Sequence, residues 1–344
     1  METRKIQSVG GGTYTVSLPK DWAESAGIAA GTVVDLHTHI DDLLVIQPQE
    51  RQEEGSATVE ITLADEDATF VERTLRAAYA VGVREVVLDA PDGIDPSQRR
   101  TVERVTRTLT GVAIVEESDT KLVVRTMLDA EEVSVRQSVR QLQFVTLSMH
   151  REATQALTGQ TRVENPHERD DQADRLYALV DRYFERGLAR LDEIDHLGVT
   201  RPDLFTLWLT ARELERIADH AERIARLGAT VTPSASTGAE LTRLADAARQ
   251  TVSDAVRVAI GDADATVARE ALDRRGRVRE DAADLERRLF ESDDSDYRLA
   301  RVLDSLSRTA EHGGNIAELG LQRVIRDGEL AGRSELATDV HSSS

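Results

Sequence analysis

Hydrophobic and polar positions alternate with a period of two in the first part of the chain. The stretch TYTVSLP places its large apolar side chains on one side: Tyr14, Val16 and Leu18. This alternation predicts a strand with one buried face. A short helix over Pro19–Ala26 and a hairpin that turns at Asp41–Asp42 are expected to follow. Residues 1–50 therefore predict a small domain of β-hairpins.

The period changes after the polar stretch RQEEGS, residues 51–56. Runs such as ATVEITL, REVVLDA and KLVVRTML are typical of strands, and helical patterns separate them. Strands that alternate with helices predict a small α/β domain over residues 57–128. No phosphate-binding glycine loop and no nucleophile motif stands in this segment, so we expect a scaffolding or dimerisation role for it.

Helical periodicity replaces the strand signal beyond Asp129. Six helices are expected: Val133–Leu157, Asp170–Ile194, Leu204–Leu227, Leu241–Ile260, Ala263–Phe290 and Leu299–Val324. The third and sixth contain related stretches, LERIADHAERIARLG from Leu214 and LSRTAEHGGNIAELG from Leu306, which agree at eight of fifteen positions. The repeat predicts two tandem three-helix bundles, over residues 131–228 and 237–325. Residues 331–344 have too little apolar content to fold and are expected to be disordered.

Both predicted bundles carry acidic residues four positions apart, which are neighbours on one helix face. The pairs are Asp170 with Asp174, Glu215 with Asp219, and Glu280 with Asp284. The sixth helix keeps only half of a fourth pair, Glu311, because Ser307 stands at the other position. Projection of the third helix places Glu215 and Asp219 at the edge of its apolar arc, where a neighbouring helix would contact it.

Carboxylates that converge in this way raise one another's pKa or attract a cation. Helical bundles bind di-iron and related centres through carboxylates on facing helices. Since the chain has no cysteine, the available donors are oxygen and imidazole, which suit iron, manganese, zinc or magnesium. The alternative is that each pair lies on a solvated face, as acids on an acidic helical protein commonly do. His220 and His312 directly follow an acid, and we expect them at a helix contact or on the surface rather than as metal ligands.

Composition adds information on the cellular setting. The 63 acidic residues exceed the 43 basic ones, for a net charge of −20, and only three of the basic residues are lysines. Such a surface remains soluble in concentrated salt, which favours a cytoplasmic protein of a salt-accumulating organism over an ordinary acidic protein. No apolar run approaches the about 18 residues of a membrane span, so any membrane association is expected to depend on a partner.

The helical part resembles the PhoU family of phosphate-uptake regulators. The resemblance rests on RELERIADHAERIA, RDDQADRLY and the acidic stretch that starts at Gly261. It covers residues 131–324 and implies two three-helix bundles with E/D-x-x-x-D motifs that hold iron or zinc clusters. The motif carries over to Asp170, Asp174, Glu215, Asp219, Glu280 and Asp284, and loosely to Glu311.

The stretch GGTYTVSLPKDWAESAGIAAGTVVDL resembles the AbrB/SpoVT family. Members interleave hairpins from two chains into one swapped-hairpin β-barrel, which implies a homodimer, and many bind DNA. Arg4, Lys5 and Lys20 are the basic residues that could contact DNA, but seven acids give residues 1–50 a net charge of −4. Phosphate contacts need local positive charge, so dimerisation is the expected role. The combination of the two parts resembles archaeal, especially haloarchaeal, phosphate regulators.

Three functions follow from these features. The first is a non-enzymatic regulator of phosphate uptake, a metal-binding dimer that acts on a phosphate transporter or a signalling protein. The second is a DNA-binding transcriptional regulator of phosphate-responsive genes. The third is an enzyme with a carboxylate-bridged metal centre; no Glu-x-x-His motif accompanies the acid pairs, which disfavours it.

Overall fold

The computed structural model describes residues 3–10, 12–38, 43–48, 58–63, 67–128, 133–160, 166–291 and 296–330. The chain divides into two compact units, residues 1–57 and 58–344, and each is described by itself. The expected turn at Asp41–Asp42, the polar stretch 51–56 and the tail 331–344 lie outside the described residues.

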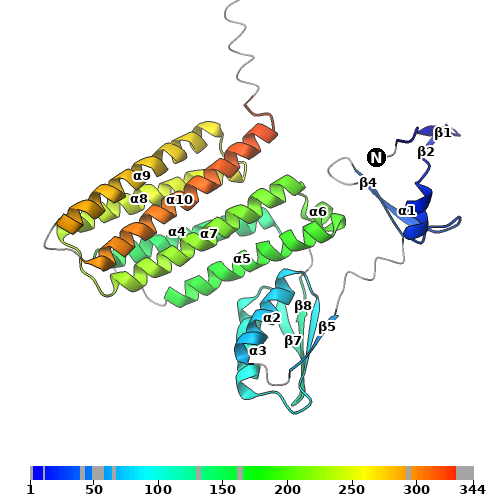
Figure 1. Cartoon of the computed structure of the whole chain (residues 1–344), viewed down its shortest axis with the longest axis horizontal. Coiled ribbons are helices and arrows are strands. Elements are labelled where there is room, and N and C mark those ends of the chain that lie inside the picture. Colours follow the sequence, from blue (N-terminus) through cyan, green and yellow to red (C-terminus); the bar gives the residue numbers. More distant parts are fainter. Residues whose placement is uncertain are drawn as a thin grey trace, which may run out of the picture. The chain divides into compact units, whose positions relative to one another are not determined.

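The first unit contains two hairpins and one short helix (Figure 1). Strand β1 (Gln7–Val9) pairs with β2 (Thr13–Thr15), and β3 (Val34–Thr38) pairs with β4 (Leu44–Pro48), both antiparallel. Helix α1 (Lys20–Ser25) lies between the hairpins in sequence. No described residue of this unit is buried. Its large apolar side chains are instead exposed: Ile6, Val9, Tyr14, Val16, Leu18, Trp22, Val33, Leu36, Leu43 and Leu44.

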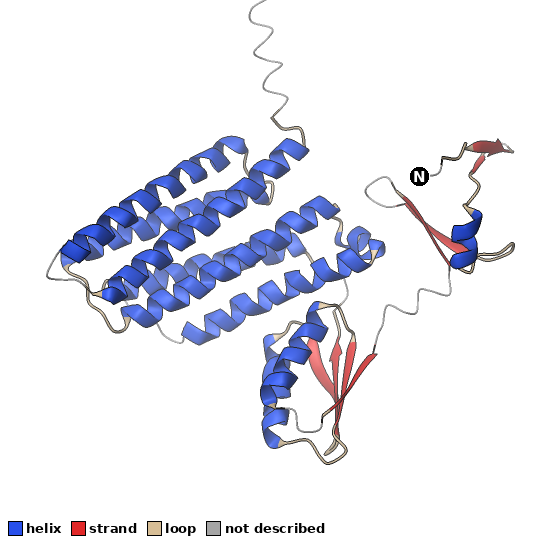
Figure 2. Ribbon diagram, in the orientation of Figure 1, coloured by secondary structure: helices blue, strands red, loops and turns tan. Residues whose placement is uncertain are grey.

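The second unit begins with a four-stranded sheet in the order β5-β6-β8-β7. Its strands are β5 (Thr58–Thr62), β6 (Glu85–Asp89), β7 (Val112–Glu117) and β8 (Lys121–Thr126). Strands β5 and β6 are parallel, and the other two contacts are antiparallel. Helices α2 (Ala68–Ala80) and α3 (Pro96–Thr108) cover one face (Figure 2) and bury Leu75, Val105, Leu122 and Val124 against it. The expected α/β domain is confirmed.

Seven helices follow, where the sequence predicted six. They are α4 (Val135–Leu157), α5 (Pro166–Ala189), α6 (Leu191–Leu197), α7 (Arg201–Gly228), α8 (Ala235–Ala259), α9 (Ala265–Glu291) and α10 (Tyr297–Arg326). The helix expected over 170–194 is confirmed as far as Ala189, but its continuation to Ile194 was wrong, because the backbone is extended at Arg190 and α6 starts at Leu191. Gly187 of α5 permits this packing, since a Cβ there would lie 2.8 Å from Ile194 and 2.6 Å from Leu204.

The helices form two groups of three, as expected, but their cores are not separate. One cluster of buried residues joins α4, α5 and α7 to the C-terminal part of α8 and to parts of α9 and α10. A second cluster joins α8, α9 and α10 to Ala153 and Leu157 of α4 and Ile224 of α7. The contacts α7–α10 and α4–α8 connect the groups (Figure 1). Each group of three therefore completes the core of the other.

Two glycines at matching positions of the repeat allow close approaches between helices. A Cβ at Gly228 of α7 would lie 3.2 Å from Leu157 of α4, and one at Gly320 of α10 would lie 2.8 Å from Val258 of α8. These two glycines occupy the same position of the sequence repeat. The repeat is therefore also a repeat of packing: α7 contacts α4 as α10 contacts α8.

Candidate functional site

The carboxylates predicted for the first bundle lie together. Asp170 and Asp174 project from α5, and Glu215 and Asp219 from α7, two helices that pack against each other. We call these four residues the acid cluster. The charge of Glu222, one turn beyond Asp219, also raises the pKa values of Asp170, Asp174 and Asp219. The sequence indicates that Glu222 belongs near the cluster, because it stands three residues after Asp219 on the same edge of the helix.

Burial and mutual repulsion raise the pKa values of the acid cluster. Burial, followed by the charges of Asp174, Glu222 and Asp219, raises the pKa of Asp170 to about 6. Burial, followed by the charges of Asp219 and Asp174, raises the pKa of Glu215 to about 7. Burial is also the main cause that raises the pKa values of Asp174 and Asp219. Each residue ionises at a cost that a bound cation would remove.

Arginines act electrostatically on the acid cluster, and none of those in the described part of the chain forms an ion pair with it. Arg212 and Arg216 lower the pKa of Glu215 from a distance, and Arg76 of α2 does the same for Asp174. Arg76 itself pairs with Glu72, at 3.2 Å from Nε to Oε1. In the part of the chain that the structure describes, no three acidic or histidine side chains already form a ligand set for a metal ion. Four neighbouring carboxylates with raised pKa values are nevertheless the donor chemistry that a hard or borderline cation requires.

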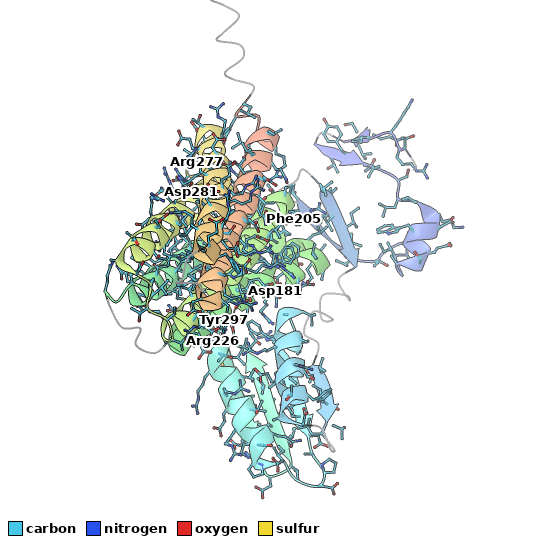
Figure 3. All side chains as sticks on the ribbon, turned by 60° about the vertical axis from the view of Figure 1, so that its left-hand side comes forward. Asp181, Phe205, Arg226, Arg277, Asp281 and Tyr297 are labelled. Carbon is cyan, nitrogen blue, oxygen red and sulfur yellow. The ribbon has the colours of Figure 1, made fainter. Side chains whose placement is uncertain are left out.

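The acids predicted for the second bundle are not brought together in the same way. Glu280 and Asp284 lie on the exposed side of α9. Arg287 forms an ion pair with Asp284, and Arg308 pairs with Glu311 at 3.2 Å. Basic and acidic side chains are both exposed along α9, among them Arg277 and Asp281 in Figure 3. Metal binding by these three acids stays a prediction without supporting geometry.

His220 and His312 lie at the contact between the two bundles, as expected, and not among the acid-cluster residues. Their ring centroids are 5.4 Å apart at the α7–α10 contact. His312 and Asn315 both contact one oxygen of Glu213, which is buried on α7. Glu213 could not be identified from the sequence, since its partners come from a different helix about 100 residues away in the chain.

A buried arginine of α5, Arg182, forms hydrogen bonds to the α/β domain. The guanidinium of Arg182 donates hydrogen bonds to the carbonyls of Tyr79 (2.6 Å), Gly82 (3.2 Å) and Val83 (3.2 Å). It also lies 4.9 Å from the centre of the Tyr79 ring. These carbonyls belong to the C-terminal end of α2, where a positive charge is favoured by the helix dipole. The charge of Arg182 is therefore compensated by backbone oxygens rather than by an acid.

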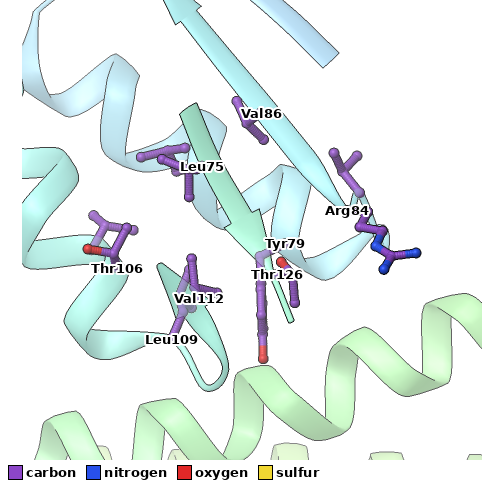
Figure 4. A pocket seen from close by; sticks show the side chains of 11 residues that line it. Leu75, Tyr79, Arg84, Val86, Thr106, Leu109, Val112 and Thr126 are labelled. Atoms are coloured by element: carbon purple, nitrogen blue, oxygen red, sulfur yellow. The ribbon is translucent and has the colours of Figure 1, made fainter. Parts of the chain in front are cut away.

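The cavity in the α/β domain is too small for a ligand. It measures about 10 Å³ and is enclosed by apolar side chains such as Leu75 and Val124, with Tyr79 and Thr126 at its edge (Figure 4). A space of that size holds about one water molecule. The cavity is a packing gap and not a binding site.

The basic residues of the first unit are exposed but do not form a concentrated positive surface. Arg4 and Lys5 precede β1, and Lys20 at the start of α1 lies 3.5 Å from Glu24. The structure therefore places the three predicted DNA-contacting residues within solvent reach, with one of them partly neutralised.

Comparisons with known proteins identify two parts of the chain. Residues 139–228 match the family model of the PhoU domain, and residues 7–54 match that of "Antidote-toxin recognition MazE, bacterial antitoxin". A similar solved structure is the "Crystal structure of PhoU from Pseudomonas aeruginosa", with 22% identity and a TM-score of 0.48, over 56% of this chain and 96% of that chain. No curated protein matches, and no described helix has the length and apolar content of a membrane span. The chain contains a PhoU domain in its C-terminal helical region and a MazE/AbrB-like domain at its N-terminus.

Proposed function

We propose that this protein is a non-enzymatic, cytoplasmic regulator of phosphate uptake that acts on a phosphate transporter or a signalling protein. The match of residues 139–228 to the PhoU domain carries this proposal. The four residues of the acid cluster, on α5 and α7, all lie within the matched segment. The proposed regulatory site, the acid cluster, therefore lies in the part of the chain that matches the PhoU domain.

The acid cluster is the proposed metal site, with iron or zinc as the ion. Asp170 and Asp174 would hold the ion from α5, and Glu215 and Asp219 from α7, after rotation of their side chains. The ion would supply positive charge that neutralises these carboxylates and links the two helices. The raised pKa values of Asp170 and Glu215 support this assignment. A link between α5 and α7 would stiffen the bundle surface that a partner contacts.

The homodimer is proposed to form through the first unit. Its strands make two separate two-stranded sheets, which are marginal alone in water. Ten large apolar side chains remain exposed there. Hairpins of a second copy, interleaved with these, would bury them in a shared barrel.

The proposed function is tested by deletion of the gene and measurement of phosphate accumulation and of phosphate-gene transcription. We expect a change in at least one of them. Unchanged behaviour at both low and high phosphate would contradict the proposal. Affinity purification in native salt, read by mass spectrometry, should recover a transporter subunit or a signalling kinase.

Metal binding is tested by elemental analysis of the purified protein and of the double variant Glu215→Ala with Asp219→Ala. We expect the variant to lose most of the metal. The matched control is Glu280→Ala with Asp284→Ala on α9, which should retain it. Equal metal content in all three proteins would show that the ligands are elsewhere.

A DNA-binding transcriptional regulator is the second candidate, favoured by the match of residues 7–54 to an antitoxin family. Arg4, Lys5 and Lys20 would contact the phosphates. A mobility shift on phosphate-gene promoters at the organism's own salt concentration separates the two functions. Absence of a shift with the purified dimer would remove this candidate.

A further inference from the structure

A polar cavity lies between the C-terminal half of α4 and the N-terminal part of α8. Its volume is about 260 Å³, and the described residues that line it have polar or charged side chains, among them two arginines, three threonines and two glutamines. Among the described residues that line it, Asp246 is the one acid. In a chain of net charge −20, this cavity is lined by a local excess of positive charge.

Arg249 is held rigidly in the wall of this cavity. Its side chain is 10% exposed. One nitrogen, Nη1, lies 3.1 Å from His150 Nδ1 and donates to Thr154 Oγ1 at 3.0 Å, while Nη2 pairs with Asp246. A guanidinium has five N–H donors. These contacts therefore leave Nε–H and one Nη2–H for a further acceptor.

His150 does not reduce the positive charge of Arg249. Burial, with the charge of Arg249 as the next cause, lowers the pKa of His150 to about 3, so the ring is neutral. Because a guanidinium only donates, His150 accepts at Nδ1 and carries its proton on Nε2. The His150 ring, as a hydrogen-bond acceptor, thus orients Arg249, and Asp246 is the one acid in the described part of the chain that pairs with Arg249.

Arg151 supplies the second positive charge. It lies on α4 in the cavity wall, is exposed, and its guanidinium has no ion pair with the residues that the structure describes. Its charge is close enough to Arg249 to contribute to lowering the pKa of that residue, after burial. Two arginines that repel each other beside hydroxyl donors are stabilised when an oxyanion lies between them.

We propose that this cavity binds inorganic phosphate, held by Arg151 and Arg249 between α4 and α8. A volume of about 260 Å³ is below the roughly 300 Å³ at which sites for drug-sized ligands begin, and it suits a small anion. The oxyanion chemistry follows from the side chains, whereas the choice of phosphate rests on the proposed function. Because α4 and α8 belong to different bundles, the bound anion would be in contact with both.

Isothermal titration of the purified full-length protein with phosphate tests this site. We expect saturable binding to the wild type and weakening by at least about tenfold in Arg151→Gln, since a charge-assisted hydrogen bond is lost. Arg151 is exposed, so the melting temperature without phosphate should not change. Asp246→Asn should bind phosphate several-fold more tightly, because the one competing carboxylate is gone; a merely structural role of Asp246 would not give this result.

Arg243→Gln is the matched control. Arg243 is exposed on α8 and neighbours Thr242, but it does not line the cavity. Equal weakening by Arg243→Gln and Arg151→Gln would overturn the proposal, as would absence of saturable binding to the wild type. Equally tight binding of sulfate would overturn the assignment to phosphate.

The outcomes distinguish this inference from the proposed function. If deletion of the gene changes phosphate accumulation but the protein binds no phosphate, only the cavity assignment fails. If the protein binds phosphate through Arg151 but its deletion leaves phosphate accumulation and transcription unchanged, only the regulatory function fails.

Discussion

Nδ1 of His312 lies 2.7 Å from Oε2 of Glu213, and this contact joins the two bundles across the α7–α10 interface. In the sequence repeat, His220 corresponds to His312 and Ser305 corresponds to Glu213. The second half of the interface therefore lacks the acid. Within the described residues, His220 Nδ1 and Ser305 Oγ are buried and have no hydrogen-bond partner. Both copies of the repeat contain the histidine, but of the described pair only His312 contacts an acid across the interface.

Replacement of Glu213 by glutamine should destabilise the protein by about 2 kcal/mol near neutral pH, since hydrogen bonds to a buried charged group are lost. The hydrogen bonds of His312 and Asn315 outweigh burial and lower the pKa of Glu213 below its ordinary value of 4.5. A lowered pKa contributes stability above pH 4.5 that disappears as the pH falls through the folded-state pKa. Denaturant unfolding should therefore show a difference between wild type and variant that shrinks in acid.

Glu318→Gln on α10, the helix that carries His312, is the control for Glu213→Gln. The side chain of Glu318 is 55% exposed and pairs with Arg275, so its loss should cost less than about 0.5 kcal/mol. A pH-independent difference for Glu213→Gln would show that the carboxylate charge does not matter.

Glu215→Gln should stabilise the metal-free protein at alkaline pH. The folded-state pKa of Glu215, about 7, lies above its ordinary value of 4.5, so wild-type stability falls as the pH rises between these values. Removal of that charge should give a gain of the order of 1 kcal/mol above pH 7, after allowance for solvent screening of a partly exposed group. Thermal unfolding in a chelator measures it.

The same variant should respond less to metal than the wild type. Added zinc or iron should raise the melting temperature of the wild type and have little effect on Glu215→Gln, because a ligand that binds only the folded state stabilises it. Glu280→Gln, on the exposed side of α9, should behave as the wild type does. Equal metal stabilisation of all three proteins would refute the acid cluster as the site.

Arg182→Leu should loosen the α/β domain from α5. Three carbonyls of α2 and the following turn lose their donor, which should cost about 3 kcal/mol. Limited proteolysis should then cut between the α/β domain and α4, near residues 128–135, faster than in the wild type. Arg301→Leu, at an exposed position of α10, should not change the cleavage rate. Unchanged protection in Arg182→Leu would mean that apolar contacts alone hold the domain.

If the proposed dimer forms through the first unit, Tyr14→Asp combined with Val16→Asp should convert it to a monomer. Both side chains are exposed, Tyr14 at 78%, and a buried charge in a shared barrel is strongly unfavourable. Light scattering after size-exclusion chromatography measures the mass. Phe290→Asp, an equally apolar and exposed position at the end of α9, should leave the mass unchanged. A monomeric wild type would contradict the proposed dimer.

Local periodicity was sufficient to predict the β3–β4 hairpin, the α/β fold of the middle segment and the grouping of the helices. The buried strand face predicted from Tyr14, Val16 and Leu18 was wrong for the single chain, where all three side chains are exposed. Projection of a single helix also placed Glu215 and Asp219 at the edge where α5 packs, because a helix face is fixed by spacing alone. The break at Arg190 could not be predicted, since it depends on Ile194 folding back onto Gly187. Arg182 and Glu213 were missed for a related reason: their partners are supplied by distant elements. The arginine partners of Asp284 and Glu311 stand three residues away on the same helix, so these two ion pairs could have been predicted from spacing.

The interwoven cores of the two bundles limit how the repeat can change. A lone bundle would expose Ala153, Leu157 and Ile224, which here are covered by the opposite half, so neither half is expected to persist if the chain is cut at residues 229–234. Substitutions on the outer faces of the bundles do not affect the packing of one bundle against the other. One copy could therefore lose an acid pair, as Ser307 shows, while the histidine at the shared interface was retained in both.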